Sequence, residues 1–323
     1  MPILDFLSLN INELGQYLFD ANKRIYLVYL ISAALLAIPV YLRTTSAFSF
    51  TGFIQFILPW RIYSALSARH DYALLIGNKL IKSAIFPLIV ITMVPVAIST
   101  SSLFEAVFGY ITPVELPAQV IVIIFTVFLF VADDFTRFIL HYILHNSAIF
   151  WEFHKVHHSA QVLTPFTIYR SHPVESLLYA FRMALTQGVV VGCCYYFFGA
   201  TLEMADILGA NLFVFLFNFC GSNLRHSHIW LSWGDKIEGI FISPAQHQIH
   251  HSADPQHFNS NYGSALACWD KLFNSLIKSS TVNTKKFTIG GNELSQRNLG
   301  QIYFEPFINA WKQCYRLIKK QLP

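Results

Sequence analysis

Charged residues are scarce in this chain of 323 residues, where they make up 12% of the sequence against 54% hydrophobic residues. A soluble globular protein usually has about 25% charged residues. The chain therefore holds roughly half the charge needed to cover a water-facing surface. Phe alone occurs 30 times. This composition argues against an ordinary soluble protein and predicts one that is integral to a membrane.

Cysteine is sparse as well, and its five copies include no CxxC pair. This argues against a disulfide scaffold and against a thiolate metal site. The formal net charge of +4 is too small to indicate a nucleic-acid partner. The first twenty residues carry Asp5, Glu13 and Asp20 and lack the basic-then-apolar pattern of a cleavable leader. We therefore expect the chain to insert through internal spans.

Several apolar runs approach the ~20 residues that a helix needs to cross the hydrocarbon core. They predict four to five transmembrane helices, over 25–42, 83–99, 116–145, 177–198 and 204–220. A shorter run, 48–58, ends at Pro59 and is typical of a re-entrant or interfacial piece. Lys and Arg recur in 43–82 and after the fifth run but are absent from 105–117 and 199–203. By the positive-inside rule, residues 135–176 and the C-terminal third lie on the cytoplasmic side.

Histidine is the residue in which the sequence is distinctive, because three groups have the spacing of metal ligands. His141 and His145 are four apart and share one face of the predicted helix. Two HxxHH boxes follow, 154–158 and 247–251, and in each we expect the first ring to share a face with the other two. Such crowding of ionisable rings at the mouths of membrane helices indicates metal binding rather than chance.

The number of rings indicates two metal ions. A single zinc ion takes three or four ligands, and these groups supply about twice that number. Imidazole suits zinc, copper, iron or nickel, so ligand type alone leaves the metal open. The Glu-x-x-His pairs of carboxylate-bridged di-iron bundles are absent from the boxes. The sequence therefore predicts an all-imidazole dinuclear site.

The motifs HYILH, FHKVHHS, YRSHPVE, SNLRHSH and SPAQHQIHHSADPQHFNSNYGSALACWDKLF resemble those of the fatty acid hydroxylase/sterol desaturase superfamily. The resemblance covers about residues 116–276. It implies an all-α integral membrane enzyme with a cytoplasmic helical cap that carries a non-haem di-iron centre. It also implies O₂-dependent hydroxylation or desaturation of a membrane lipid, fatty acyl or sterol-like. The rings that it carries over as metal ligands are His141, His145, His154, His157, His158, His226, His247, His250 and His251.

Six further side chains are given weaker roles. His172 either binds metal or orients a ligand through Glu175, and His228 is either a ligand or a neighbour of one. His257 and Asn261 are expected to support the third box. Asp134 lies seven residues before His141, on the same helical face, and is expected to orient a metal-bound imidazole or to line a substrate channel. Asp133 is the neighbouring acidic residue. The alternative for these two aspartates is a structural role, in which Asp133 forms an ion pair with Arg137 at the helix exit.

The cofactors expected are two iron ions, O₂ and electrons from NAD(P)H. The sequence has no CxxCH motif and no GxGxxG after a strand, so an external cytochrome, ferredoxin or reductase is implied as electron donor. We expect three segments: N-terminal membrane helices over 1–115, the catalytic domain over 116–276, and a tail over 277–323 that includes an interfacial amphipathic or packed terminal helix.

Two other classes of function remain open. A membrane zinc hydrolase would need a carboxylate base such as the Glu of HExxH, and none of the boxes contains one. A metal transporter would place its ligands within the spans, whereas these histidines lie beyond them. Within the oxygenase class, a sterol desaturase and an alkylglycerol-type monooxygenase are both compatible with the motifs.

Overall fold

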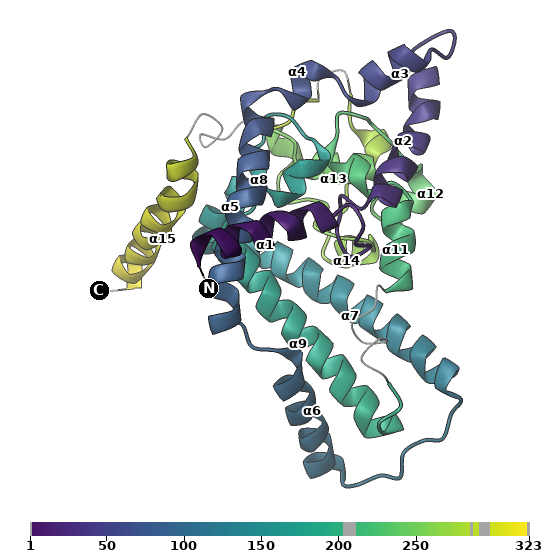
Figure 1. The fold of residues 1–323 in the computed structure, drawn as a ribbon, viewed down its shortest axis with the longest axis vertical. Coiled ribbons are helices and arrows are strands. Elements are labelled where there is room, and N and C mark those ends of the chain that lie inside the picture. Colours follow the sequence, from purple (N-terminus) through teal and green to yellow (C-terminus); the bar gives the residue numbers. More distant parts are fainter. Residues whose placement is uncertain (1, 203–210, 285–286, 291–297, 322–323) are drawn as a thin grey trace.

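The computed structural model describes all residues except 1, 203–210, 285–286, 291–297 and 322–323 (Figure 1). The described residues form helices joined by loops, with two isolated β-bridges, Phe241 to Leu266 and Ser252 to Ile289. The helices of the N-terminal part are α1 (Ile3–Gln16), α2 (Leu27–Leu42), α3 (Phe50–Ile57), α4 (Trp60–Tyr63), α5 (Leu66–Ile89) and α6 (Met93–Phe108). Those that follow are α7 (Ala118–Asn146), α8 (Ala148–His158), α9 (Pro173–Phe198), α11 (Leu212–Phe219), α12 (Asp235–Glu238), α13 (Pro244–His250), α14 (Cys268–Leu272) and α15 (Leu299–Gln321). Short 3₁₀ segments are η1 (Pro165–Tyr169), η2 (Ser222–His226), η3 (Pro255–His257) and η4 (Ser279–Thr281).

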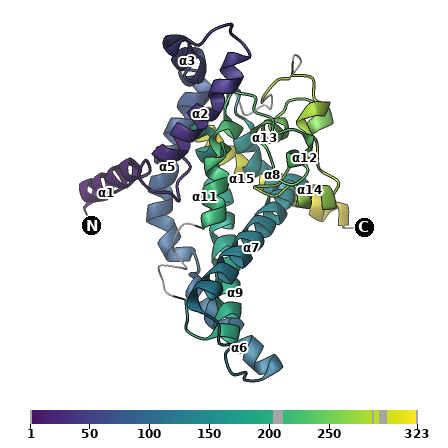
Figure 2. The same cartoon turned by 90° about the vertical axis from the view of Figure 1, so that its right-hand side faces the viewer.

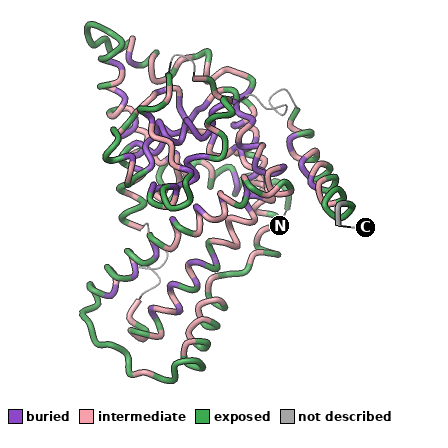
Figure 3. The backbone as a smooth tube through the Cα atoms, turned by 180° about the vertical axis from the view of Figure 1, so that it is seen from behind, coloured by how far each residue is buried: buried purple, intermediate pink, exposed green. Residues whose placement is uncertain are grey.

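The molecule has two parts, an arm and a head. The arm consists of α6 with most of α7 and α9, and the head contains the remaining helices with the C-terminal end of α7 (Figures 1 and 2). Buried residues gather in the head, while the arm is mostly exposed or half-buried (Figure 3). Apolar helices that remain exposed along their length fit a lipid surround. The arm is therefore the part of the described chain that suits a membrane.

Three helical stretches of the described chain are long and apolar enough to cross a membrane: Leu66–Phe108, Ala118–Asn146 and Pro173–Phe198. The sequence predicted four to five. The first run forms α2, which has 16 residues. The shorter run over 48–58 forms the eight-residue helix α3. Of the fifth run, residues 203–210 lie outside the described residues, and the remainder forms the eight-residue helix α11.

The prediction of one continuous helix over 83–99 is wrong. α5 ends at Ile89, where Val90 adopts an extended conformation, and α6 begins at Met93. Pro87 lies inside the last turn of α5 and removes an N–H donor there. Pro95 falls in the first turn of α6, where an N–H has no partner within the helix anyway. The chain therefore bends between the head and the arm instead of crossing straight through.

α7 connects the arm to the head. Its 29 residues extend about 43 Å at 1.5 Å per residue, which exceeds the ~30 Å hydrocarbon core. Phe125 and Leu129 on α7 pack with Val190 and Cys194 of α9 in a buried cluster. The C-terminal turns of α7, which carry His141 and His145, consequently lie in the head.

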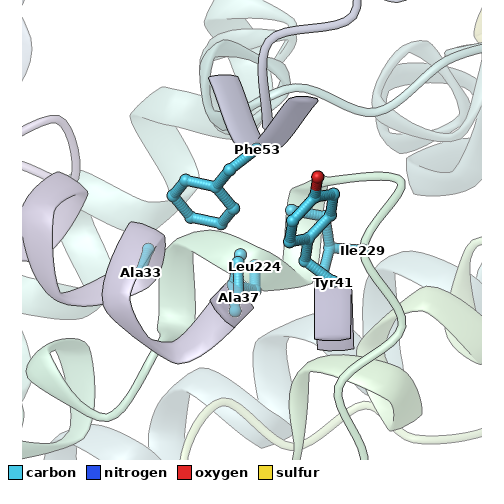
Figure 4. Close-up of a cluster of buried hydrophobic side chains, with 6 residues drawn as sticks. All are labelled: Ala33, Ala37, Tyr41, Phe53, Leu224 and Ile229. Carbon is cyan, nitrogen blue, oxygen red and sulfur yellow. The ribbon is translucent and has the colours of Figure 1, made fainter. Parts of the chain in front are cut away.

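A second hydrophobic cluster fixes α2 against the segment that carries His226. Ala33 and Ala37, four residues apart on α2, leave room for Leu224 of η2 (Figure 4). Tyr41 and Phe53 cover the same cluster with ring centroids 5.6 Å apart. Because small side chains allow close approach, α2 holds η2 in a defined position.

The terminal helix α15 packs against the head. Ile302 is buried with Leu74 of α5 and Val156 of α8. Phe304, Trp311 and Tyr315 on the same helix are exposed. An interfacial role for these aromatic side chains stays a prediction.

Glycines allow α6 and α9 to lie in contact. A Cβ added at Gly192 would lie 2.5 Å from the carbonyl oxygen of Ala97 and 2.7 Å from Thr100 Cβ. A Cβ at Gly188 would meet Val96 Cβ at 2.5 Å. This Gly-x-x-x-Gly spacing is typical of close helix pairs in membranes.

We expect Gly192→Ala to lower the thermal unfolding temperature of the protein in detergent. The exchange of Gly for Ala in a helix is by itself worth about 1 kcal/mol of stabilisation, but forcing a methyl into this contact should cost about 1–3 kcal/mol. Gly15→Ala in α1 is the control, since nothing lies within 4 Å of its added Cβ. A rise in unfolding temperature for Gly192→Ala equal to that for Gly15→Ala would contradict the packing argument.

Candidate metal centre

Nine histidines that are distant in sequence converge in the head. α7, α8 and α13 supply seven of them, η2 supplies His226, and His251 caps the C-terminus of α13. They form two groups in which the ligand atoms all lie within 4.8 Å of one another. We call them cluster A and cluster B. Cluster A contains His141, His145, His154, His158 and His250, and cluster B contains His157, His226, His247 and His251.

The two HxxHH boxes divide between the clusters in opposite senses. The first and last rings of box 154–158 enter cluster A, and its middle ring, His157, enters cluster B. In box 247–251, the first and last rings enter cluster B, and His250 enters cluster A. Helical residues advance by about 100° each, so positions i+3 and i+4 diverge to either side of position i. The expectation that each box serves one shared face is thus only approximate, because each box contributes to both clusters.

The clusters lie directly side by side. The rings of His158 in cluster A and His251 in cluster B stack with centroids 4.6 Å apart, and those of His250 in cluster A and His247 in cluster B stack at 5.5 Å. Two ions held in such clusters would be neighbours.

Ring nitrogens point at one another inside the clusters. His141 Nε2 lies 3.1 Å from His154 Nε2, and His226 Nε2 lies 3.2 Å from the Nε2 atoms of His247 and His251. In addition, Nε2 of His145, His158 and His250 is buried without a hydrogen-bond partner among the described residues. Leaving such an atom unsatisfied costs about 1–3 kcal/mol. A cation at each centre would satisfy these lone pairs together, so the residues present fit a pair of metal ions.

Backbone carbonyls hold three of the rings from behind. The Nδ1–H groups of His141, His157 and His250 donate to the carbonyl oxygens of Tyr262 (2.8 Å), Arg170 (3.1 Å) and Ser260 (2.7 Å). A proton fixed on Nδ1 leaves the Nε2 lone pair facing the cluster. Metal-binding histidines in proteins commonly have this support.

Burial keeps these rings neutral. Desolvation lowers the pKa of His154 to about 3 and that of His157 to about 4. Burial, followed by the neighbouring rings, also lowers the pKa values of His158, His226 and His247 well below the ordinary value. The same causes lower those of His250 and His251. Neutral imidazole is the form that binds metal, so the site is ready for metal at neutral pH.

Glu175 and His172, from the HPxE motif, have separate positions. Glu175 Oε1 lies 3.0 Å from His154 Nδ1, so this carboxylate can orient a cluster A ring directly. His172 lies in neither cluster. It caps α9 by accepting a hydrogen bond from Val174 N, and its Nε2–H donates to the carbonyl oxygen of Tyr303 at 2.9 Å. Its observed contacts therefore connect α9 to α15.

His228 and Asp134 also lie away from the cluster centres. His228 Nε2 donates to the carbonyl oxygen of Phe56 at 2.7 Å. Asp134 contacts none of the histidines through any hydrogen bond in the described structure. Its carboxylate accepts from the backbone N–H groups of Ala265 (2.8 Å) and Leu266 (3.0 Å) and from Trp269 Nε1 (2.9 Å). The role that these contacts show is to anchor the 265–269 segment to α7.

The ion pair between Asp133 and Arg137, the alternative that the sequence offered, is confirmed, and Asp133 has a second arginine partner. Its carboxylate lies 3.0 Å from Arg137 and 2.8 Å from Arg182 of α9. One acid thus serves two arginines and ties α7 to α9.

His257 and Asn261 contact residues that flank the third box, from the loop that follows it. His257 Nδ1 lies 2.8 Å from Ser252 Oγ, next to His251. Asn261 adopts a left-handed conformation with φ of 52°. Its side chain donates to the carbonyl oxygens of Gln246 and Ile277 at 3.0 Å each. This fixes a loop whose flanking carbonyls, at Ser260 and Tyr262, orient rings of cluster A.

Sequence reasoning missed the role of Arg170 and Asp71. Arg170 is almost fully buried, its Nε donates to Asp71 Oδ1 at 2.6 Å, and its own carbonyl accepts from His157. Arg170 stands within the YRSHPVE motif, which was a usable signal. Asp71 had none, since the two partners are 99 positions apart.

Cavities adjoin the clusters on two sides. One of about 270 Å³ is lined by rings of both clusters, among them His141, His154 and His226. Another of about 350 Å³ is lined by His145, His158, His250 and His251. A small reactant therefore has room to reach the clusters.

The fold and the site define a helical protein of membrane type with two buried imidazole clusters. Residues 126–275 match the family model described as fatty acid hydroxylase, so this part of the chain carries a fatty acid hydroxylase domain. The resemblance to the fatty acid hydroxylase/sterol desaturase superfamily is thereby confirmed.

Three curated relatives illustrate the range of this superfamily. The chain is 31% identical over 143 residues to ornithine lipid hydroxylase OlsE of Rhizobium tropici, covering 44% of this chain and 38% of that protein. It is 25% identical to alkylglycerol monooxygenase of Caenorhabditis elegans, covering 44% of this chain and 25% of that one. It is 28% identical to Delta(7)-sterol 5(6)-desaturase of Eremothecium gossypii, covering 45% and 35%. The match thus spans well under half the length of these relatives, and no solved structure matches the chain.

For metal held by the clusters, we expect Glu175→Gln to weaken binding by about 10–100-fold, because the ring of His154 loses its carboxylate partner. Competition with a calibrated chelator measures this affinity. Glu105→Gln, an exposed position on α6, is the control and should bind metal as the wild type does. Equal affinities for all three proteins would show that Glu175 does not orient a ligand.

Proposed function

We propose that the protein is a non-haem di-iron oxidoreductase that hydroxylates or desaturates a membrane lipid in an O₂-dependent reaction. The observation that supports this most strongly is the pair of adjacent imidazole clusters within a fatty acid hydroxylase domain. Nine rings exceed the three or four that one zinc ion takes, which favours two ions. The named relatives are a hydroxylase, a monooxygenase and a desaturase, which favours iron and redox chemistry.

Bound iron would supply the activation of O₂ for attack on an unactivated C–H bond. The protein's own task is to hold nine neutral rings in place, through the carbonyls of Arg170, Ser260 and Tyr262 and the carboxylate of Glu175. A second task is to place one carbon of the lipid against the clusters while water is kept out. The cavity of about 270 Å³ suits this positioning, since rings of both clusters line it.

The nine rings His141, His145, His154, His157, His158, His226, His247, His250 and His251 are the proposed ligands. His172 and His228 are left out of the proposal because their ring nitrogens engage backbone groups away from the clusters. The electrons would come from NAD(P)H through a separate cytochrome, ferredoxin or reductase. The distribution of Lys and Arg favours the cytoplasmic side for the clusters.

A membrane zinc hydrolase is the alternative class. It needs a carboxylate free to act as a base beside a bound water. Among the residues that line the 270 Å³ cavity, Glu175 is the one carboxylate, and it lies against His154. This position suits orientation of a ring better than activation of water.

Metal analysis of anaerobically purified protein tests the proposal. We expect about two irons per chain in the wild type, and marked loss in His250→Ala, which alters cluster A, and in His247→Ala, which alters cluster B. His228→Ala is the matched control and should keep its iron, since this ring lies outside both clusters.

One zinc per chain after iron-replete expression, with no iron, would contradict the di-iron proposal and favour hydrolysis. Loss of iron from His228→Ala equal to that from the cluster variants would contradict the assignment of ligands. Lipid analysis of cells that express the wild type or His250→Ala would then identify the product.

A further inference from the structure

The cavity beside the clusters carries an excess of positive charge. Its lining includes Arg24, Lys82, Arg137 and Arg225, against the single carboxylate of Glu175. These side chains come from four separate parts of the chain: the loop before α2, and α5, α7 and η2. Charged residues make up only 12% of the chain. Four cations around one cavity are therefore more than this composition would place there without a selective reason.

Within the described residues the cations are only partly compensated, because the carboxylates of Glu175, Asp133 and Asp134 act on them mainly at longer range. Arg24, Lys82 and Arg225 form no ion pair with any carboxylate that the structure describes. Arg137 does pair with Asp133, but that carboxylate is shared with Arg182. Buried charges are normally paired, because an unpaired one loses its hydration without compensation.

Arg225 has hydrogen-bonding capacity left over. It is 4% exposed, and its Nη2 donates to the carbonyl oxygens of Ile242 (3.2 Å) and Ser264. Its guanidinium carbon lies 4.5 Å from the ring centroid of Phe217. Its Nε–H is buried with no partner among the described residues. A guanidinium held this firmly, with a donor unused, is preorganised for an anion.

Arg24 is held by neutral partners. Its Nη1 donates to Asn218 Oδ1 and, at 2.6 Å, to Ser222 Oγ. Burial, with the neighbouring Arg137 as the next cause, lowers the pKa of Arg24 to about 10, so the side chain is still cationic at neutral pH. An anion in the cavity would stabilise the charged form of Arg24 against both effects.

A mostly apolar cavity of about 340 Å³ adjoins the cationic one, and Asp133 and four amide side chains also line it. Leu129, Phe130, Val214 and Phe215 contribute to its walls, and Arg137 lines both cavities. Along α7, Leu129, Arg137 and His141 follow one another from the arm toward the head. The order along the helix is therefore apolar cavity, cationic cavity, histidine clusters.

We propose that the cationic cavity binds the acidic group of an amphiphilic substrate, a carboxylate or a phosphate ester, with its apolar chain in the adjoining cavity. This deepens the proposed function and rests on it: the substrate is an acidic lipid, oxidised at a carbon within a few bonds of the acidic group. The size of the cavity agrees, because 270 Å³ holds about nine waters at ~30 Å³ each, which suits a headgroup rather than a whole chain.

Binding of single-chain amphiphiles to the full chain as purified, in a neutral detergent and without O₂ or reductant, tests this proposal. The probes are dodecyl phosphate, dodecanoate and dodecanol, which share one alkyl chain, and inorganic phosphate, which has none. Calorimetry or thermal shift gives the affinities. We expect the two acids to bind roughly tenfold or more tightly than dodecanol, and inorganic phosphate to bind far more weakly than dodecyl phosphate.

Charge variants locate the site. Arg24→Gln and Lys82→Gln should each weaken binding of dodecyl phosphate by roughly tenfold, while Arg24→Lys, which keeps the charge, should retain most of it. Lys79→Gln is the matched control, because Lys79 lies on α5 three residues before Lys82 but pairs with Glu13 and does not line the cavity. It should bind as the wild type does.

Three results would overturn the proposal: dodecanol binding as tightly as the acids, unchanged binding in both Gln variants, or equal loss in Lys79→Gln. Inorganic phosphate binding as tightly as dodecyl phosphate would overturn the lipid assignment and indicate a site for a free anion. None of these measurements depends on iron or turnover. Failure of this proposal is therefore distinguishable from failure of the di-iron proposal, which metal content decides.

Discussion

The burial of neutral imidazoles is the constraint on which the rest of this structure depends. Each ring has one N–H that needs an acceptor and one lone pair that needs a donor or a cation, and a buried group left without either costs about 1–3 kcal/mol. The carbonyls of Arg170, Ser260 and Tyr262 meet the first need, which aims the lone pairs of three rings at the clusters. Other contacts around the site hold these carbonyls in place. The Arg170–Asp71 pair fixes one of them, and Asn261, in its left-handed conformation, fixes the loop that holds the other two.

The arm and the head are connected by α7, which packs and forms hydrogen bonds in both parts. α7 is long enough to contribute Leu129 to the packing against α9 and His141 to cluster A. Asp133 joins α7 to α9 through Arg182, and Asp134, the next residue, anchors the segment over 265–269. A lipid lying along the arm would therefore lie against α7, the same helix that carries His141 and His145 of cluster A. Because α7 is continuous, it lines first the mostly apolar cavity, then the cationic cavity, and finally carries rings of cluster A.

How far the sequence could predict the site differs from residue to residue. The i, i+3, i+4 spacing of the boxes was sufficient to identify their rings, because helical geometry fixes which side chains are neighbours. Helical geometry also explains the error of assigning each box to one face, since i+3 and i+4 diverge. The break between α5 and α6 could have been expected from Pro87 and Pro95, since both prolines lie within the run over 83–99 that was predicted to form one span. For His172, His228 and Asp134, motif position indicated nearness to the site but not the partner, which in each case is a backbone group distant in sequence.

The sequence by itself determined the apolar helical character of the protein, its superfamily resemblance and the identity of the nine rings. These depend on composition and on local spacing, and both are written in consecutive residues. Only the tertiary structure decided how the rings divide into two clusters, which carbonyls orient them, and that four cations from separate segments line one cavity. Many of the contacts behind these features join residues 90 or more positions apart, such as Asp71 with Arg170 or Arg24 with Asn218. Those contacts follow from the packing of whole helices, in which no short stretch of sequence specifies its partner.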